Sequence, residues 1–76
     1  SSSELEKIIK QSINDISEIV MDFSKLEYLS SAGLRVILAI QKHMNITNGK
    51  MTIKNVNSTI MEIFEITGFL DILTIE

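Results

Sequence analysis

Two adjacent hydroxyl groups, those of Ser30 and Ser31, are the side chains of this sequence best placed for chemistry. They open the stretch Ser30-Ser31-Ala32-Gly33-Leu34-Arg35, which leads into an apolar run predicted to be helical. Free backbone N–H groups and the helix dipole favour negative charge at a helix start. A phosphate on Ser31 would be tolerated there and would add roughly −1.5 to −2 charges to the surface. The same serines could instead serve only as a helix cap, so both roles remain open.

Groups suited to catalysis are scarce elsewhere. His43, the one histidine, falls on the polar side of the predicted second helix, where we expect it to be a solvated surface residue. It follows Ser31 by twelve residues, or about 18 Å along a helix axis, which excludes a hydrogen-bonded pair within one helix. The three glycines stand alone, so no phosphate-binding loop is present, and the chain has no cysteine. We therefore expect no enzymatic activity, no cofactor and no metal ion.

Asp22 is the best acidic candidate near such a site, because it lies at the end of an apolar strand-like run. A carboxylate in that position can also cap the loop or turn that follows. The sequence does not decide between the two roles.

Composition narrows the classes of partner. The 76 residues are enough for one domain, 45% of them are hydrophobic, and the net charge is −3. The seven basic residues are scattered singly along the chain, which argues against nucleic acid as a partner; they are Lys7, Lys10, Lys25, Arg35, Lys42, Lys50 and Lys54. The longest apolar run, Val36 to Ile40, is too short to span a bilayer, and no signal-peptide pattern opens the chain. We expect a cytoplasmic protein that makes no membrane contact.

The first half of the chain predicts a helix, a strand and a second helix. Ser3 and Glu6 form a capping-box pattern before an apolar helical face made by Leu5, Ile8, Ile9, Ile13 and Ile16. Ile19 to Phe23 is a short apolar run, as expected of a strand covered on both faces. After a loop from Ser24 to Leu29, the second helix runs from the two serines to about Met44.

The second half continues the alternation. Asn45 to Lys50 predicts a turn, and Lys50 to Val56 alternates as a half-buried or edge strand should, with Met51 and Ile53 on one side. A third helix follows possible caps at residues 57–59 and ends at Gly68; its inner face is Ile60, Ile63, Phe64 and Thr67. Leu70 to Ile75 is a final strand or turn. The order α-β-α-β-α-β indicates an α/β fold with a mostly parallel sheet.

Four segments resemble landmarks of the STAS domain, a family named for sulphate transporters and anti-sigma factor antagonists. The segments are Ile19-Val20-Met21-Asp22-Phe23-Ser24-Lys25-Leu26, Tyr28-Leu29-Ser30-Ser31-Ala32-Gly33-Leu34, Asn48-Gly49-Lys50-Met51-Thr52-Ile53 and Ile63-Phe64-Glu65-Ile66-Thr67-Gly68-Phe69. The serine motif and the Phe-x-x-Thr-Gly ending, about thirty residues apart, form the most specific pair. The resemblance covers about three quarters of the chain and implies a STAS-like α/β fold.

The resemblance also implies a function. In anti-sigma factor antagonists, the unphosphorylated protein binds an anti-sigma factor that is itself a serine kinase and thereby frees sigma. Phosphorylation of one serine ends that binding, and a phosphatase resets it. Ser31 takes the phosphoserine position, with Ser30 as second choice, and Gly33 and Leu34 match their places in the motif. The alternative is a STAS scaffold in a transporter, lipid-trafficking or stress-signalling assembly that is never phosphorylated.

Two departures from the family pattern accompany this resemblance. Ser30 stands where the motif often has Asp, which removes a negative charge beside the phosphorylation position. The family begins with two strands before its first helix, and no residues for them precede the first helix here. We expect residues 1–76 to form a single STAS-like domain, truncated at its N-terminus. Its uncovered strand edge could pair with a second copy of the chain.

The surface predicted to meet the partner is the first half of the second helix with the preceding loop. That helix has few polar residues, which suggests that one apolar flank meets another protein. The predicted contact residues are Leu29, Ser30, Ser31, Gly33, Leu34, Arg35 and Leu38.

Overall fold

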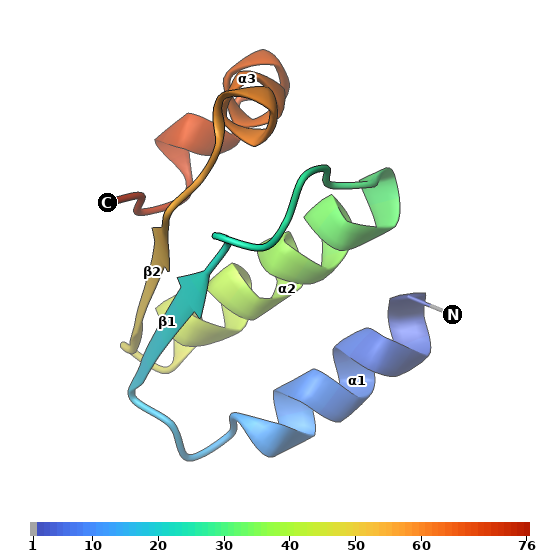
Figure 1. Ribbon diagram of the computed structural model, residues 1–76. Helices are drawn as coiled ribbons and strands as arrows, with labels where there is room; N and C mark the ends of the chain where they lie inside the picture. The colour runs from blue at the N-terminus through green and yellow to red at the C-terminus, as the bar shows by residue number, and fades with distance from the viewer. Residues whose placement is uncertain (1) are drawn as a thin grey trace. The chain divides into compact units, whose positions relative to one another are not determined.

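The computed structural model describes residues 2–76 (Figure 1). The elements follow one another as α1 (Ser2–Ser12), β1 (Glu18–Asp22), α2 (Ser31–Ile46), β2 (Lys50–Lys54), α3 (Ser58–Thr67) and η1, a 3-10 turn (Phe69–Asp71). The chain forms two compact units. The residues up to Glu18 with Ser30–Lys50 are called the helical unit, and Ile19–Leu29 with Met51–Glu76 are called the sheet unit.

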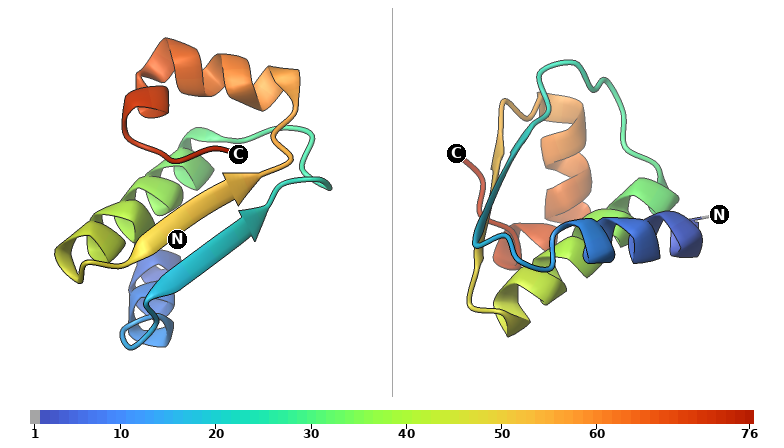
Figure 2. Two further views of the ribbon diagram at one scale, coloured as in Figure 1. Left: turned by 90° about the vertical axis from the view of Figure 1, so that its left-hand side faces the viewer. Right: turned by 90° about the horizontal axis from the view of Figure 1, so that it is seen from below.

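In the helical unit, α1 and α2 lie side by side and run in the same general direction (Figures 1 and 2). The predicted first helix is correct in kind, but its apolar face is only partly buried. Leu5, Ile8 and Ile16 are exposed, whereas Ile13 is buried. The helix ends at Ser12 and a turn follows, so the last two predicted positions leave the helical phase. The predicted cap at Ser3 is wrong, because Ser3 is the second residue of α1.

The end of α2 lies two residues beyond the predicted Met44, at Ile46. The hydroxyl of Thr47 donates to the carbonyl oxygens of His43 (3.1 Å) and Met44 (3.3 Å), which satisfies acceptors that a helix end leaves open. A β-carbon on Gly49 would lie 2.5 Å from Cε of Met44 and 3.0 Å from the carbonyl oxygen of Ser17. The turn into β2 therefore favours glycine, because a larger residue would require the buried Met44 side chain to shift.

In the sheet unit, β1 and β2 are adjacent and parallel (Figure 2). The backbone N–H of Phe23 extends the ladder beyond β1 by donating to the carbonyl oxygen of Lys54 at 2.9 Å. Met51 and Ile53 are buried on one side of β2, as their alternation predicts. The prediction that the first strand is covered on both faces is wrong, because the side chain of Val20 is 54% exposed.

The third helix and the C-terminal segment complete the core of the sheet unit. Ile60 and Phe64 of α3 have no exposed surface, and the ring of Phe69 stacks on that of Phe64 with 6.4 Å between centroids. Gly68 ends α3 with a φ of 82°, which favours glycine. The segment predicted as strand or turn consists of η1 followed by one parallel bridge between Ile53 and Ile75. The α/β class is confirmed, with the last predicted strand reduced to that bridge.

Candidate functional site

The two serines before α2 have different structural roles. Ser30 is the N-cap: its backbone is extended, and its Oγ accepts a hydrogen bond from the N–H of Gly33 at 3.1 Å. Its carbonyl oxygen accepts from the N–H of Leu34 at 2.9 Å, the first hydrogen bond of the helix. Ser31 is the first helical residue and is exposed. Among residues 2–76, no hydrogen bond is recorded for its hydroxyl.

This arrangement suits a covalently bound anion on Ser31. N–H groups in the first turn of an α-helix have no carbonyl partner within the helix, and the positive end of the dipole lies there. A phosphate on an exposed Oγ could accept hydrogen bonds from such groups without displacing the hydroxyl of Ser30 from Gly33. Capping and modification can therefore coexist at this helix start.

The predicted contact residues differ in exposure. Ser30, Ser31 and Arg35 are exposed. Gly33, Leu34 and Leu38 are half-buried, so each offers part of its surface. Leu29 is 9% exposed and belongs to the sheet unit, so it offers little surface of its own. The partner role of all these residues stays a prediction.

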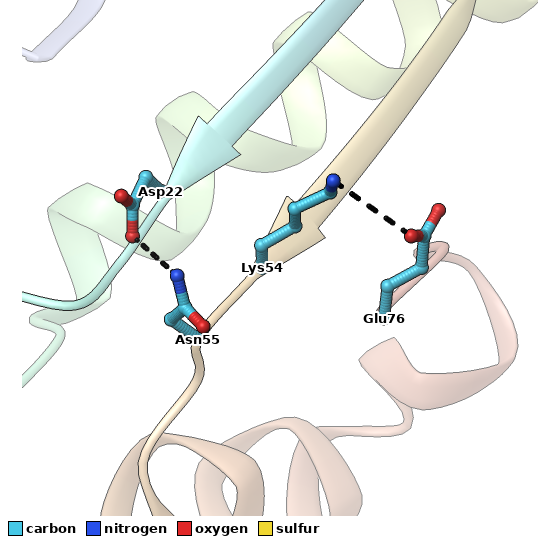
Figure 3. Close-up of polar contacts among 4 residues, drawn as sticks. All are labelled: Asp22, Lys54, Asn55 and Glu76. Carbon is cyan, nitrogen blue, oxygen red and sulfur yellow. Dashed lines mark hydrogen bonds and ion pairs between the residues drawn. The ribbon is translucent and has the colours of Figure 1, made fainter.

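Asp22 holds the loop that follows β1 (Figure 3). Its Oδ1 accepts hydrogen bonds from the backbone N–H of Ser24 at 2.9 Å and from Nδ2 of Asn55 at 3.0 Å. The bond from Asn55 lowers the pKa of the Asp22 carboxyl most, followed by the bonds from Ser24, with a smaller contribution from the charge of Lys54. Asp22 thus has the loop-capping role that the sequence left open. Figure 3 also shows Lys54, which pairs with Glu76 at 3.9 Å.

Asn57 has two roles, of which sequence reasoning found one. Its Oδ1 accepts from the N–H of Ile60 at 2.8 Å and so caps α3. Its Nδ2 donates to the carbonyl oxygens of Leu26 (2.9 Å) and Glu27 (3.4 Å), which ties the loop after β1 to the start of α3. The residue type could have indicated the second role. The asparagine side chain has two N–H donors besides its acceptor oxygen, whereas the serine hydroxyl has one donor.

The prediction that His43 is a solvated surface residue is wrong. Its side chain is half-buried, and its Nε2 is buried without a hydrogen-bond partner in the described part of the chain. The sequence placed it correctly on the polar side of α2 but could not show that residues of α1 lie beside it.

Residues 2–76 contain neither a cluster suited to a metal ion nor a helix suited to span a membrane. No group of three or more His, Cys, Asp or Glu side chains is arranged to hold a metal ion there. Within the same residues, none of the helices combines the length and hydropathy needed to cross a membrane.

Comparison with known proteins agrees with this α/β fold. The family model of the STAS domain matches residues 1–76, and the chain belongs to that family. A protein of Bordetella bronchiseptica named "Putative anti-sigma factor antagonist BtrV" is 39% identical over 57 residues. The matched region is 75% of this chain and 49% of the relative, so the chain spans about half the length of the curated relative it matches.

Proposed function

We propose that this chain is an anti-sigma factor antagonist module that acts by binding rather than by catalysis. The unphosphorylated module binds an anti-sigma factor with serine kinase activity and frees sigma. That kinase phosphorylates Ser31, which ends the binding, and a phosphatase restores the hydroxyl. The exchange takes place in the cytoplasm, where bacterial transcription occurs.

One observation carries this proposal: Ser30 caps α2, while the exposed hydroxyl of Ser31 takes no part in the cap. A kinase can therefore reach Ser31 and modify it without removing the hydrogen bond that starts the helix. The added charge would lie among exposed and half-buried residues, including Arg35 and Leu34, that we propose as the partner surface. A dianion in an interface must lose its hydration and repels any acidic partner group, so it weakens binding.

The experiment is incubation of the full chain with an anti-sigma factor kinase and ATP, followed by intact mass measurement and peptide mapping. We expect one phosphate, on Ser31, and none on Ser31→Ala. Modification of another residue, or of the Ser31→Ala variant, would contradict the proposal. If no phosphate is added, the phosphorylation switch is wrong, and the alternative of a STAS scaffold that is never phosphorylated replaces it. Ser30 at the usual Asp position, which removes a charge beside Ser31, is compatible with that alternative.

A second arm of the same experiment measures binding to the kinase without ATP. Ser31→Asp should weaken binding at least about tenfold, because the carboxylate would be desolvated in the interface. Its melting temperature should change little, since an acidic side chain in the first turn is tolerated or mildly stabilising by about 0.3–1 kcal/mol. Unchanged affinity in a folded Ser31→Asp variant would exclude Ser31 from the interface.

A further inference from the structure

The helical unit contains an open groove between α1 and α2 with a volume of about 460 Å³. Glu6 and Lys10 line it from α1, and Arg35, Leu38, Lys42, His43 and Ile46 are among the residues that line it from α2. A neighbouring hollow of about 360 Å³ shares Lys10 and His43 with the groove and adds Lys7. The two neighbouring hollows are together called the α1–α2 groove below.

The α1–α2 groove gathers positive charge that is dispersed in the sequence. Four of the seven Lys and Arg residues line it, in a chain whose net charge is −3. Among the residues lining the two hollows, Glu6 is the acidic one, and it pairs with Lys10 at 3.7 Å. Within residues 2–76, no ion pair is recorded for Arg35 or Lys42. These two cations are available to another molecule.

The groove also has an apolar part. Leu38 is half-buried and Ala39 is buried, whereas Ile46 at the end of α2 is 81% exposed. An isoleucine that exposed gains free energy when another apolar side chain covers it. His43 also lines the groove, and its Nε2 is buried without a hydrogen-bond partner among the described residues.

We propose that the α1–α2 groove docks an acidic, amphipathic segment of a protein partner. Carboxylates of such a segment would meet Lys10, Arg35 and Lys42, while its apolar side chains would cover Leu38 and Ile46. This recognition mode places an amphipathic segment on a groove between helices. The groove shares Arg35 and Leu38 with the surface proposed for the phosphorylation switch. It extends beyond that surface, because His43 follows Ser31 by twelve residues, about 18 Å along α2.

The apolar part of the groove favours a peptide over nucleic acid. A nucleic acid is held by a row of cations along its phosphates, and an exposed isoleucine beside them adds little to that contact. An acidic amphipathic peptide can contact both the cations and the apolar side chains of the groove. It is also attracted to this groove more than to the rest of a chain that carries a net negative charge.

The test uses a fluorescein-labelled peptide of about 15 residues with Glu and Leu at helical spacing, long enough to form a helix on binding. Its affinity for the full chain is measured by fluorescence anisotropy at low salt, where charge contributes most. Lys42→Glu should weaken binding at least about tenfold, and the neutral Lys42→Gln should lie between it and wild type. Lys25→Glu is the matched control, because it makes the same charge change at an exposed loop residue outside the groove.

Amide shifts in ¹H–¹⁵N NMR spectra should locate the peptide on α1 and α2. Circular dichroism checks that each variant is folded. If Lys42→Glu does not fold, the neutral Lys42→Gln variant still allows the comparison with wild type. Equal loss of affinity in Lys42→Glu and Lys25→Glu would overturn the proposal. So would equal binding of a peptide with Lys in place of Glu, the absence of binding, or tighter binding of a single-stranded oligonucleotide.

Discussion

Ser30 and Ser31 illustrate how two neighbouring residues of the same type acquire different tasks. The Oγ of Ser30 satisfies the N–H of Gly33, whereas the exposed Ser31 has no such bond recorded. The sequence predicted that serines would open this helix, but both serines suited the cap equally well. The choice depends on backbone angles, since the capping residue is extended and the next is helical.

This difference leads to a prediction for stability. Ser30→Ala should lower the free energy of unfolding by about 1 kcal/mol, because alanine leaves the N–H of Gly33 without its acceptor. Ser30→Asp should retain the stability, since aspartate caps as well as serine and restores the residue common in the family motif. Ser31→Ala is the matched control and should change stability by less than about 0.5 kcal/mol. Urea unfolding measures all three, and a larger loss in Ser31→Ala than in Ser30→Ala would show that Ser31 is the cap.

At the scale of elements, local patterns predicted which segments form and tertiary contacts decided where they end. The apolar period placed the three helices, and the alternation at Met51 and Ile53 gave the buried side of β2. The sequence could not predict the extension of α2, which depends on the hydroxyl of Thr47 reaching back to His43. Likewise, the composition of β1 suggested burial on both faces, but exposure of Val20 depends on what the rest of the chain covers.

The end of β1 gives a prediction for pH. The folded state lowers the pKa of Asp22 below its ordinary 3.8, so the ionised carboxylate stabilises the fold. This stabilisation is complete above the unfolded pKa and is lost as pH falls through the lower folded value. Wild type should therefore be more stable than Asp22→Asn near neutral pH. The difference between their free energies of unfolding should shrink below about pH 4. Chemical unfolding across the acid range measures it, and a difference independent of pH would mean that the charge of Asp22 has no stabilising role.

At the scale of the whole molecule, charge is distributed unevenly in a way that composition conceals. The helical unit has five basic and four acidic residues, and the sheet unit has two basic and six acidic residues. The sequence indicated scattered lysines because Lys7 and Lys10 are far from Arg35 and Lys42 along the chain. These four residues reach one groove only because α1 packs beside α2. No local sequence pattern predicts that packing.

The sheet leads to a prediction for association. β1 pairs with β2 on one side, and within residues 2–76 no strand pairs with its other edge. The strand contains no lysine or proline to discourage pairing, and Val20 is exposed. We expect the 76-residue polypeptide to dimerise or aggregate as its concentration rises, through that edge. Sedimentation over a concentration series tests this, with Val20→Lys as the variant that should shift the equilibrium toward monomer. A wild-type chain that stays monomeric at about millimolar concentration would contradict the expectation.

The double use of the Asn57 side chain couples two parts of the sheet unit in local unfolding. Its oxygen holds the first turn of α3 and its nitrogen holds the loop at Leu26, so neither can open fully without straining or breaking the bonds of the other. Fraying at the start of α3 would thereby release the loop after β1, which continues along the chain into Ser30. Fluctuation of one helix end thus reaches the backbone that precedes the candidate phosphorylation site, through a single amide group.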